Sequence, residues 1–224
     1  ISKFIDSFVH AAAEFKVAIL GGNVTTAPNT VITVTIIGLA KDKMLLERST
    51  ASPGNKIAVT GYLGASAAGL QMLKGSAVSD PRARDILRQA HLRPTPRVKE
   101  GQILIKQGVR TAIDISDGLI ADLDHICESS KVNAKINMEQ VPVHPLVTAH
   151  CLNSQQLALS GGEDYELLFT ASSSDEEKIL SLTKKVSGSP PTKIGAIIEE
   201  DGIWLQKEAG RKRLRPGGYV HFSQ

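Results

Sequence analysis

Aromatic residues are scarce in this chain and make up only 4% of its 224 residues. Proteins that bind single-stranded nucleic acid stack bases on aromatic side chains, so this scarcity argues against such a surface. The late run Arg211–Arg215 is basic, but we expect it to form a solvated loop, and we predict no nucleic-acid partner. The formal net charge of +3 fits a site for an anionic metabolite without requiring one.

Cysteine and long apolar runs are also nearly absent. Cys127 and Cys151 are the two cysteines, and their spacing fits neither a metal site nor a redox motif, which is typical of free thiols in a reducing cytoplasm. No apolar run approaches the ~20 residues that span a bilayer, so no membrane contact is expected. The start has no Met, no basic leader and no cleavage site. We therefore expect a cytoplasmic protein, and a fragment or processed chain.

Several catalytic motifs are missing as well. The sequence contains no GxSxG elbow, no Walker A loop and no Rossmann fingerprint, and its six histidines show no metal-ligand spacing. Function must therefore be sought in other residues.

Hydrophobic spacing predicts a two-lobed α/β or α+β protein. Apolar residues recur at helical spacing over 1–15, and β-branched or apolar runs predict strands at 17–20 and 30–40, with 44–48 as a hairpin partner. The turn at 52–55 is the expected boundary between a first lobe, 1–50, and a second lobe, 51–224.

The second lobe alternates between predicted strands and helices. The strands are expected at 56–60, 111–115, 133–138 and 165–171, with a closing hairpin formed by 193–198 and 203–206. The helices are expected at 65–73, from Asp80 to about 89, and at 99–106, 118–129 and 174–186.

The stretch Asp114-Ile-Ser-Asp-Gly-Leu119 is the most informative. Asp114 is expected at the end of a buried strand, and Ser116 or Asp117 is expected to cap the helix that follows. Exposed N–H groups at a helix start favour an anion, and two carboxylates three residues apart are suited to Mg²⁺. An ordinary capped turn explains the same pattern, so both interpretations stay open.

Three further features invite a functional interpretation but have simpler alternatives. Residues 161–166 place three carboxylates behind two glycines, as a ligand loop or an ordinary polar loop would. The two glycines of Gly21-Gly22-Asn23 carry no Cβ, so a ligand can approach the backbone closely, although a tight turn explains the same residues. Arg48 is either a phosphate-binding fork or a solvated side chain.

Taken in order, these motifs strongly resemble the thiamine-monophosphate kinase family, within the ATP-binding superfamily that includes aminoimidazole ribonucleotide synthetase and selenophosphate synthetase. The resemblance extends over the whole chain and rests on the following segments: Gly21-Gly-Asn23…Ala27-Pro28, Arg48-Ser49, Val59-Thr-Gly-Tyr-Leu-Gly-Ala-Ser-Ala-Ala-Gly-Leu70, His91-Leu-Arg-Pro-Thr-Pro-Arg97, Ala112-Ile-Asp-Ile-Ser-Asp-Gly-Leu119, Leu159-Ser-Gly-Gly-Glu-Asp-Tyr-Glu-Leu167 and Gly218-Tyr-Val-His-Phe222.

The resemblance implies ATP-dependent phosphorylation of thiamine monophosphate to thiamine diphosphate by in-line transfer with Mg²⁺, and a homodimer in the full-length form. It also implies a role for each matching residue. The ATP contacts would be Gly22, Asn23, Arg48 and Ser116; the metal ligands Asn23, Asp114 and Asp117; and the contacts to thiamine phosphate Glu163 and Tyr219.

Two departures from the family pattern bear on activity. Asn23 stands where the family has Asp, and its neutral carbonyl oxygen is a weaker Mg²⁺ ligand than a carboxylate. The chain also resembles only about the last two-thirds of the enzyme, so we expect little or no kinase activity from it alone. A superfamily enzyme with another acceptor and a non-catalytic binding or oligomerisation module are the rival hypotheses.

Overall fold

The computed structural model describes residues 1–40, 44–76, 78–174, 181 and 191–214. The chain divides into two compact units, Ile1–Leu39 and Ala40–Gln224, and each is described by itself. The second unit thus begins at Ala40, whereas the second lobe was expected to begin at residue 51. No described helix is both long and apolar enough to cross a membrane.

The first unit is a helix followed by extended chain. Helix α1 (Ser2–Glu14) confirms the predicted amphipathic helix. The strands predicted at 17–20 and 30–40 were wrong: all of residues 17–40 are described and none belongs to a strand. A strand needs backbone partners as well as β-branched residues, and within this unit these segments have no ladder partner. Apolar side chains such as Leu20, Ile36 and Ile37 remain exposed as a result.

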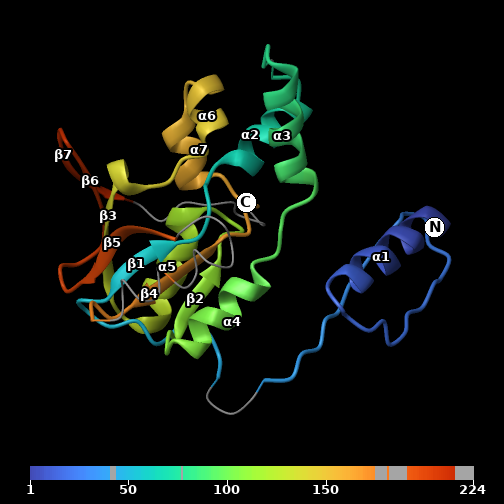
Figure 1. Cartoon of the computed structure of the whole chain (residues 1–224), viewed down its shortest axis with the longest axis horizontal. Coiled ribbons are helices and arrows are strands. Elements are labelled where there is room, and N and C mark those ends of the chain that lie inside the picture. Colours follow the sequence, from blue (N-terminus) through green and yellow to red (C-terminus); the bar gives the residue numbers. More distant parts are fainter. Residues whose placement is uncertain (41–43, 77, 175–180, 182–190, 215–224) are drawn as a thin grey trace. The chain divides into compact units, whose positions relative to one another are not determined.

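The described residues of the second unit build one seven-stranded sheet with the order β2-β4-β1-β5-β3-β6-β7 (Figure 1). All neighbouring strands are antiparallel except β3 and β6, which are parallel. The strands are β1 (Lys56–Val59), β2 (Thr111–Asp114), β3 (Asn133–Asn137), β4 (Leu167–Ala171), β5 (Thr192–Ile198), β6 (Ile203–Lys207) and β7 (Gly210–Leu214).

Both faces of the β2-β4-β1 part of the sheet are covered. Side chains alternate between faces along a strand, so Leu168 joins the large core under α5 (Leu119–Ser130). Its neighbour Phe169 joins a smaller core with Leu104 of α4 (Val98–Lys106) on the other face. This double packing fixes β2, and with it the strand end that carries Asp114 (Figure 1).

Four helices gather beyond one end of the sheet. They are α2 (Ala65–Leu73), α3 (Pro81–Leu92), α6 (Pro145–His150) and α7 (Ser154–Ser160), with a short 3₁₀ turn at Met138–Gln140. They share a core that contains Ala68, Leu87 and Val147. The predicted cap of α3 is confirmed, since Asp80 Oδ1 accepts a hydrogen bond of 2.9 Å from the Arg82 N–H. The short helices α6 and α7 were not predicted.

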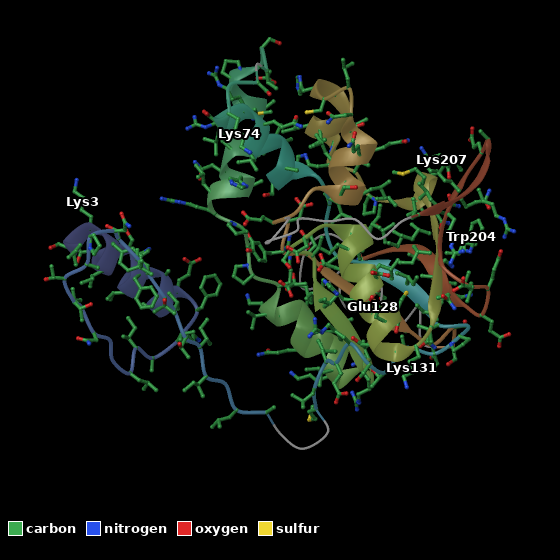
Figure 2. The ribbon with its side chains drawn as sticks, turned by 180° about the vertical axis from the view of Figure 1, so that it is seen from behind. Lys3, Lys74, Glu128, Lys131, Trp204 and Lys207 are labelled. Atoms are coloured by element: carbon green, nitrogen blue, oxygen red, sulfur yellow. The ribbon has the colours of Figure 1, made fainter. Side chains whose placement is uncertain are left out.

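The closing hairpin predicted from 193–198 and 203–206 was wrong, although both strands exist. Strand β3 lies between β5 and β6, and the actual hairpin joins β6 to β7. The expected solvated loop at 211–215 is therefore edge strand β7 as far as Leu214. Its Arg211 packs 4.6 Å from the ring centroid of Trp204, which Figure 2 labels on β6. The predicted helix at 174–186 lies almost wholly outside the described residues.

Candidate active site

A cavity of about 400 Å³ lies where β2 ends and α5 begins. Four residues predicted from the sequence line it together, namely Arg48, Asp114, Ser116 and Asp117. Asp114 is the last residue of β2 and is exposed, while its neighbour Ile115 is fully buried. The alternation of the strand thus directs this carboxylate to the face opposite the large core that contains Ile115.

The start of α5 differs from the sequence prediction. Neither Ser116 nor Asp117 caps the helix; Gly118 is the N-cap and makes no side-chain cap bond. Instead, Oδ2 of Asp122 accepts hydrogen bonds of 3.0, 3.1 and 3.1 Å from the N–H groups of Ser116, Asp117 and Gly118. The three N–H groups of the loop before the helix are therefore bound by the protein's own carboxylate.

Sequence reasoning missed Asp122, although a signal was present. An Asp in the first turn of a helix is favoured by the helix dipole, and Asp122 follows the N-cap by four residues. Burial raises the pKa of Asp122 to about 6, and the nearby Asp117 and Asp114 charges add to the rise, although the loop N–H groups oppose it. The cavity therefore concentrates negative charge.

Arg48 reaches the cavity because the chain around it is tied to both β2 and α5. The Glu47 N–H donates to the Arg110 carbonyl at 2.7 Å, and Glu47 pairs with Thr111 in an isolated parallel β-bridge. The Ser130 hydroxyl at the end of α5 donates to the Arg48 carbonyl at 2.7 Å. Glu128 and Lys131, labelled in Figure 2, mark this end of the helix. The guanidinium-bearing residue Arg48 thus lines the cavity beside the carboxylates.

The donor set at the cavity fits a hard divalent cation. Asp117, Asp122 and His125 each place one ligand atom within 4.8 Å of the other two. Asp114 adds a further carboxylate to the same cavity wall. Carboxylate oxygens are the ligands that Mg²⁺ prefers, usually together with waters and phosphate oxygens.

The second acidic motif is bound directly to this loop. The N–H groups of Glu163 and Tyr165 donate to the carbonyls of Ser116 and Ile115, both at 2.9 Å. A Cβ at Gly162 would lie only 2.3 Å from the Ser116 carbonyl oxygen, so this contact requires glycine. Glu163 and Tyr165 adopt φ values of 65° and 51°, a left-handed conformation that costs about 1–3 kcal/mol for residues of this kind.

The three carboxylates of this motif do not serve one site. Asp164 accepts hydrogen bonds from the N–H groups of Gly64 and Ser66 at 2.7 and 3.0 Å. Glu166 is buried and forms a two-bond pair with Arg97, including Arg97 Nε to Oε2 at 2.7 Å, and accepts from Thr60 Oγ1 at 2.6 Å. Glu163 alone among the three is exposed, with a carboxylate oxygen 3.7 Å from His91 Nδ1.

Three predicted site residues remain, namely Gly22, Asn23 and Tyr219. Gly22 and Asn23 belong to the first unit, where both are exposed. Tyr219 lies outside the described residues. Their predicted roles in binding ATP, metal and thiamine phosphate therefore stay predictions.

Comparison with known proteins shows that residues 52–207 match the family described as AIR synthase related protein, C-terminal domain. The chain is 41% identical to the thiamine-monophosphate kinase of Buchnera aphidicola subsp. Acyrthosiphon pisum over 99% of its own length and 69% of the relative. The match of the ordered motifs is thus accompanied by similarity over nearly the whole chain.

Solved structures agree with this relationship. The thiamine-monophosphate kinase of Stenotrophomonas maltophilia K279a is 32% identical with a TM-score of 0.69, over 76% of this chain and 56% of that one. AaThiL complexed with AMPPCP and TMP is 33% identical with a TM-score of 0.65, over 79% of this chain and 54% of that one. The chain therefore spans about half of these solved chains. It belongs to the thiamine-monophosphate kinase family of AIR synthase related proteins.

Proposed function

We propose that this chain carries part of the active site of an enzyme that transfers the γ-phosphoryl group of ATP to thiamine monophosphate and forms thiamine diphosphate. The observation that carries the proposal is the cavity that brings together Arg48, Asp114, Ser116 and Asp117. The relatives' name and the complex of AaThiL with AMPPCP, an ATP analogue, and TMP support the two substrates.

The chemistry of the acceptor explains why the cavity holds acids and an arginine. A phosphate monoester is already anionic and nucleophilic, so transfer needs alignment and charge neutralisation more than a strong base. In the proposal, Asp114 and Asp117 hold Mg²⁺, which would screen the phosphate oxygens when bound. Arg48 presents a guanidinium fork to phosphate oxygens, and the half-buried Ser116 hydroxyl orients the nucleotide.

The proposal assigns the acceptor side to Glu163 and Tyr219, and further ATP contacts to Gly22 and Asn23. The hydrogen bond from the Glu163 N–H to the carbonyl of Ser116, which lines the cavity, supports the assignment of Glu163. We also propose a homodimer for the full-length family member. The exposed apolar side chains of the first unit support it, since an apolar surface of this kind is usually covered by protein.

A coupled assay of ADP release tests the proposal. The chain is joined to the part of the Buchnera relative that the match does not cover, and ATP and Mg²⁺ are supplied with thiamine monophosphate or with other phosphorylated acceptors. We expect release that depends on thiamine monophosphate and falls by about 10²–10³ in Asp114→Asn. The chain assayed without the added part measures the little or no activity expected of it.

Two results would replace the proposal with a rival. Release that depends only on another acceptor would indicate a different enzyme of the superfamily. Calorimetry that detects binding of thiamine phosphates without turnover in the joined protein would indicate a binding module.

A further inference from the structure

Asp122 has an unusual position for a carboxylate in a helix. It lies in the first turn of α5 with only 1% of its surface exposed, yet it lines the cavity described above. Its Oδ2 accepts three hydrogen bonds from consecutive backbone N–H groups, those of Ser116, Asp117 and Gly118. Three donors to one ionised oxygen hold the backbone in one arrangement more firmly than neutral bonds would.

The same loop is held from its other side. The Ser116 carbonyl accepts a hydrogen bond from the Glu163 N–H. Gly118 has a φ of 112°, and a Cβ at this position would lie only 2.9 Å from the carbonyl carbon of Ser160. The loop therefore donates its N–H groups to the Asp122 carboxylate, while its Ser116 carbonyl accepts from the Glu163 N–H. Loss of its carboxylate would leave three N–H groups without this acceptor.

Charge gives a second reason to regard this arrangement as functional. Ligand atoms of Asp117 and Asp122 lie within 4.8 Å of each other, and two carboxylates that close repel. A chain that needed only a helix cap has a simpler solution in a Ser or Asn at the N-cap. Asp122 instead places a buried carboxylate at the wall of the cavity.

We propose that Asp122 is a positioning residue, whose carboxylate fixes the Ser116–Gly118 loop and thereby aims the Asp117 carboxylate into the cavity. The effect on metal binding rests on the proposed function, whereas the effect on the loop does not. Groups that orient a metal ligand in this way typically contribute 10–100-fold to metal affinity.

The test compares three variants of the whole chain. Asp122→Ala removes the acceptor, and Asp122→Asn keeps one neutral oxygen that can still accept. Asp124→Ala is the matched control, because it removes the same charge from the same helix at a side chain that does not line this cavity. The readouts are hydrogen exchange at the three loop amides by NMR, and affinity for Mn²⁺ alone by the loss of its free EPR signal.

We expect exchange at Ser116, Asp117 and Gly118 to rise by about tenfold or more in Asp122→Ala, by less in Asp122→Asn, and not at all in Asp124→Ala. Mn²⁺ affinity should fall in the same order, by about 10–100-fold in Asp122→Ala. If Asp122→Ala does not fold, the Asn variant still carries the test through the same three amides.

Unchanged exchange in both Asp122 variants would overturn the proposal, and so would a rise spread evenly over β2 and α5. A rise confined to the loop, in a chain whose wild type binds no Mn²⁺, would support the positioning role and contradict the metal site of the proposed function. The two failures are therefore distinguishable.

Discussion

The two acidic motifs of this chain lie side by side but use their carboxylates differently. At the end of β2, Asp114 is exposed and Asp117 half-buried, and both line the cavity. Before β4, Asp164 and Glu166 are bound by the chain's own N–H, hydroxyl and guanidinium groups, and only Glu163 is exposed. Asp122 resembles the second group although it belongs to the first motif's helix.

The comparison shows that hydrogen-bond partners, more than spacing in the sequence, separate ligand-binding acids from structural ones. A carboxylate that already accepts strong bonds from buried groups stabilises the fold and has less capacity left for a ligand than an exposed carboxylate has. We therefore expect the two groups to respond differently to mutation. Changes at the cavity carboxylates Asp114 and Asp117 should lower activity and leave stability unchanged, whereas changes at the hydrogen-bonded Asp164 and Glu166 should lower stability.

The largest effect is expected at the cavity. Asp114→Asn and Asp117→Asn in the joined protein should each lower kcat by about 10²–10³, because a neutral amide is a weaker ligand than a carboxylate for the cation that would screen the phosphate charge. Steady-state ADP release measures this. Thermal unfolding should change little, since relief of repulsion from Asp122 opposes any lost contact; a large fall in Tm would place these residues in the structural group.

Breaking the buried ion pair should mainly affect stability. Glu166→Ala leaves Arg97 and Thr60 without their shared partner and should lower the free energy of unfolding by about 3 kcal/mol. Urea unfolding followed by circular dichroism measures this. Glu166→Gln, which keeps the shape and one acceptor, should cost less, and equal losses in the two variants would contradict the role given to the carboxylate.

The pH dependence of stability offers a further test of the structural group. Burial raises the pKa of Asp164 to about 6, although the Gly64 and Ser66 N–H groups oppose the rise. The native state then holds this proton more tightly than the unfolded chain does, so its contribution to stability is greatest at low pH and declines as pH rises. From pH 4 to 7 the decline should be about 2 kcal/mol.

Asp164→Asn removes this titration, so its unfolding free energy should fall less between pH 4 and 7 than that of the wild type. Urea unfolding at several pH values gives both slopes. Parallel curves for the two proteins would show that Asp164 does not titrate as described.

The smallest effect is expected at Glu163. Glu163→Gln removes an exposed charge near His91 and should raise the KM for thiamine monophosphate several-fold, by about 1 kcal/mol of binding, with kcat and Tm nearly unchanged. Initial rates at varied acceptor concentration separate the two constants. A fall in kcat with constant KM would assign Glu163 to the transferring phosphate instead of acceptor binding.

Much of the second unit was predictable because its signals are local. The helix 65–73 was predicted with its observed bounds, and the strand 111–115 was correct to one residue. Pairing was not predictable in the same way: β3 separates two strands that are neighbours in sequence, and 30–40 has strand-forming residues without strand partners. Side-chain propensity specifies the type of element, whereas partners depend on distant chain.

The same distinction applies to the site. Spacing identified Asp114 and Asp117 but left a structural role open, and the ordered motifs pointed to the family. The role of Asp122 depends on the backbone geometry of three preceding residues, which spacing alone does not give. The separation of Asp164 and Glu166 from Glu163 depends on contacts with Thr60, directly after β1, and with α2, more than ninety residues away.

Metal binding by the cavity is tested most directly by the position of a metal ion in a crystal of the chain grown with AMPPCP and Mn²⁺. If Asp114 and Asp117 hold the metal, an anomalous peak will lie in the cavity at about 2.1 Å from carboxylate oxygens of both residues, beside the nucleotide phosphates. A nucleotide bound with its metal elsewhere, while both of these carboxylates remain without a metal, would contradict this assignment.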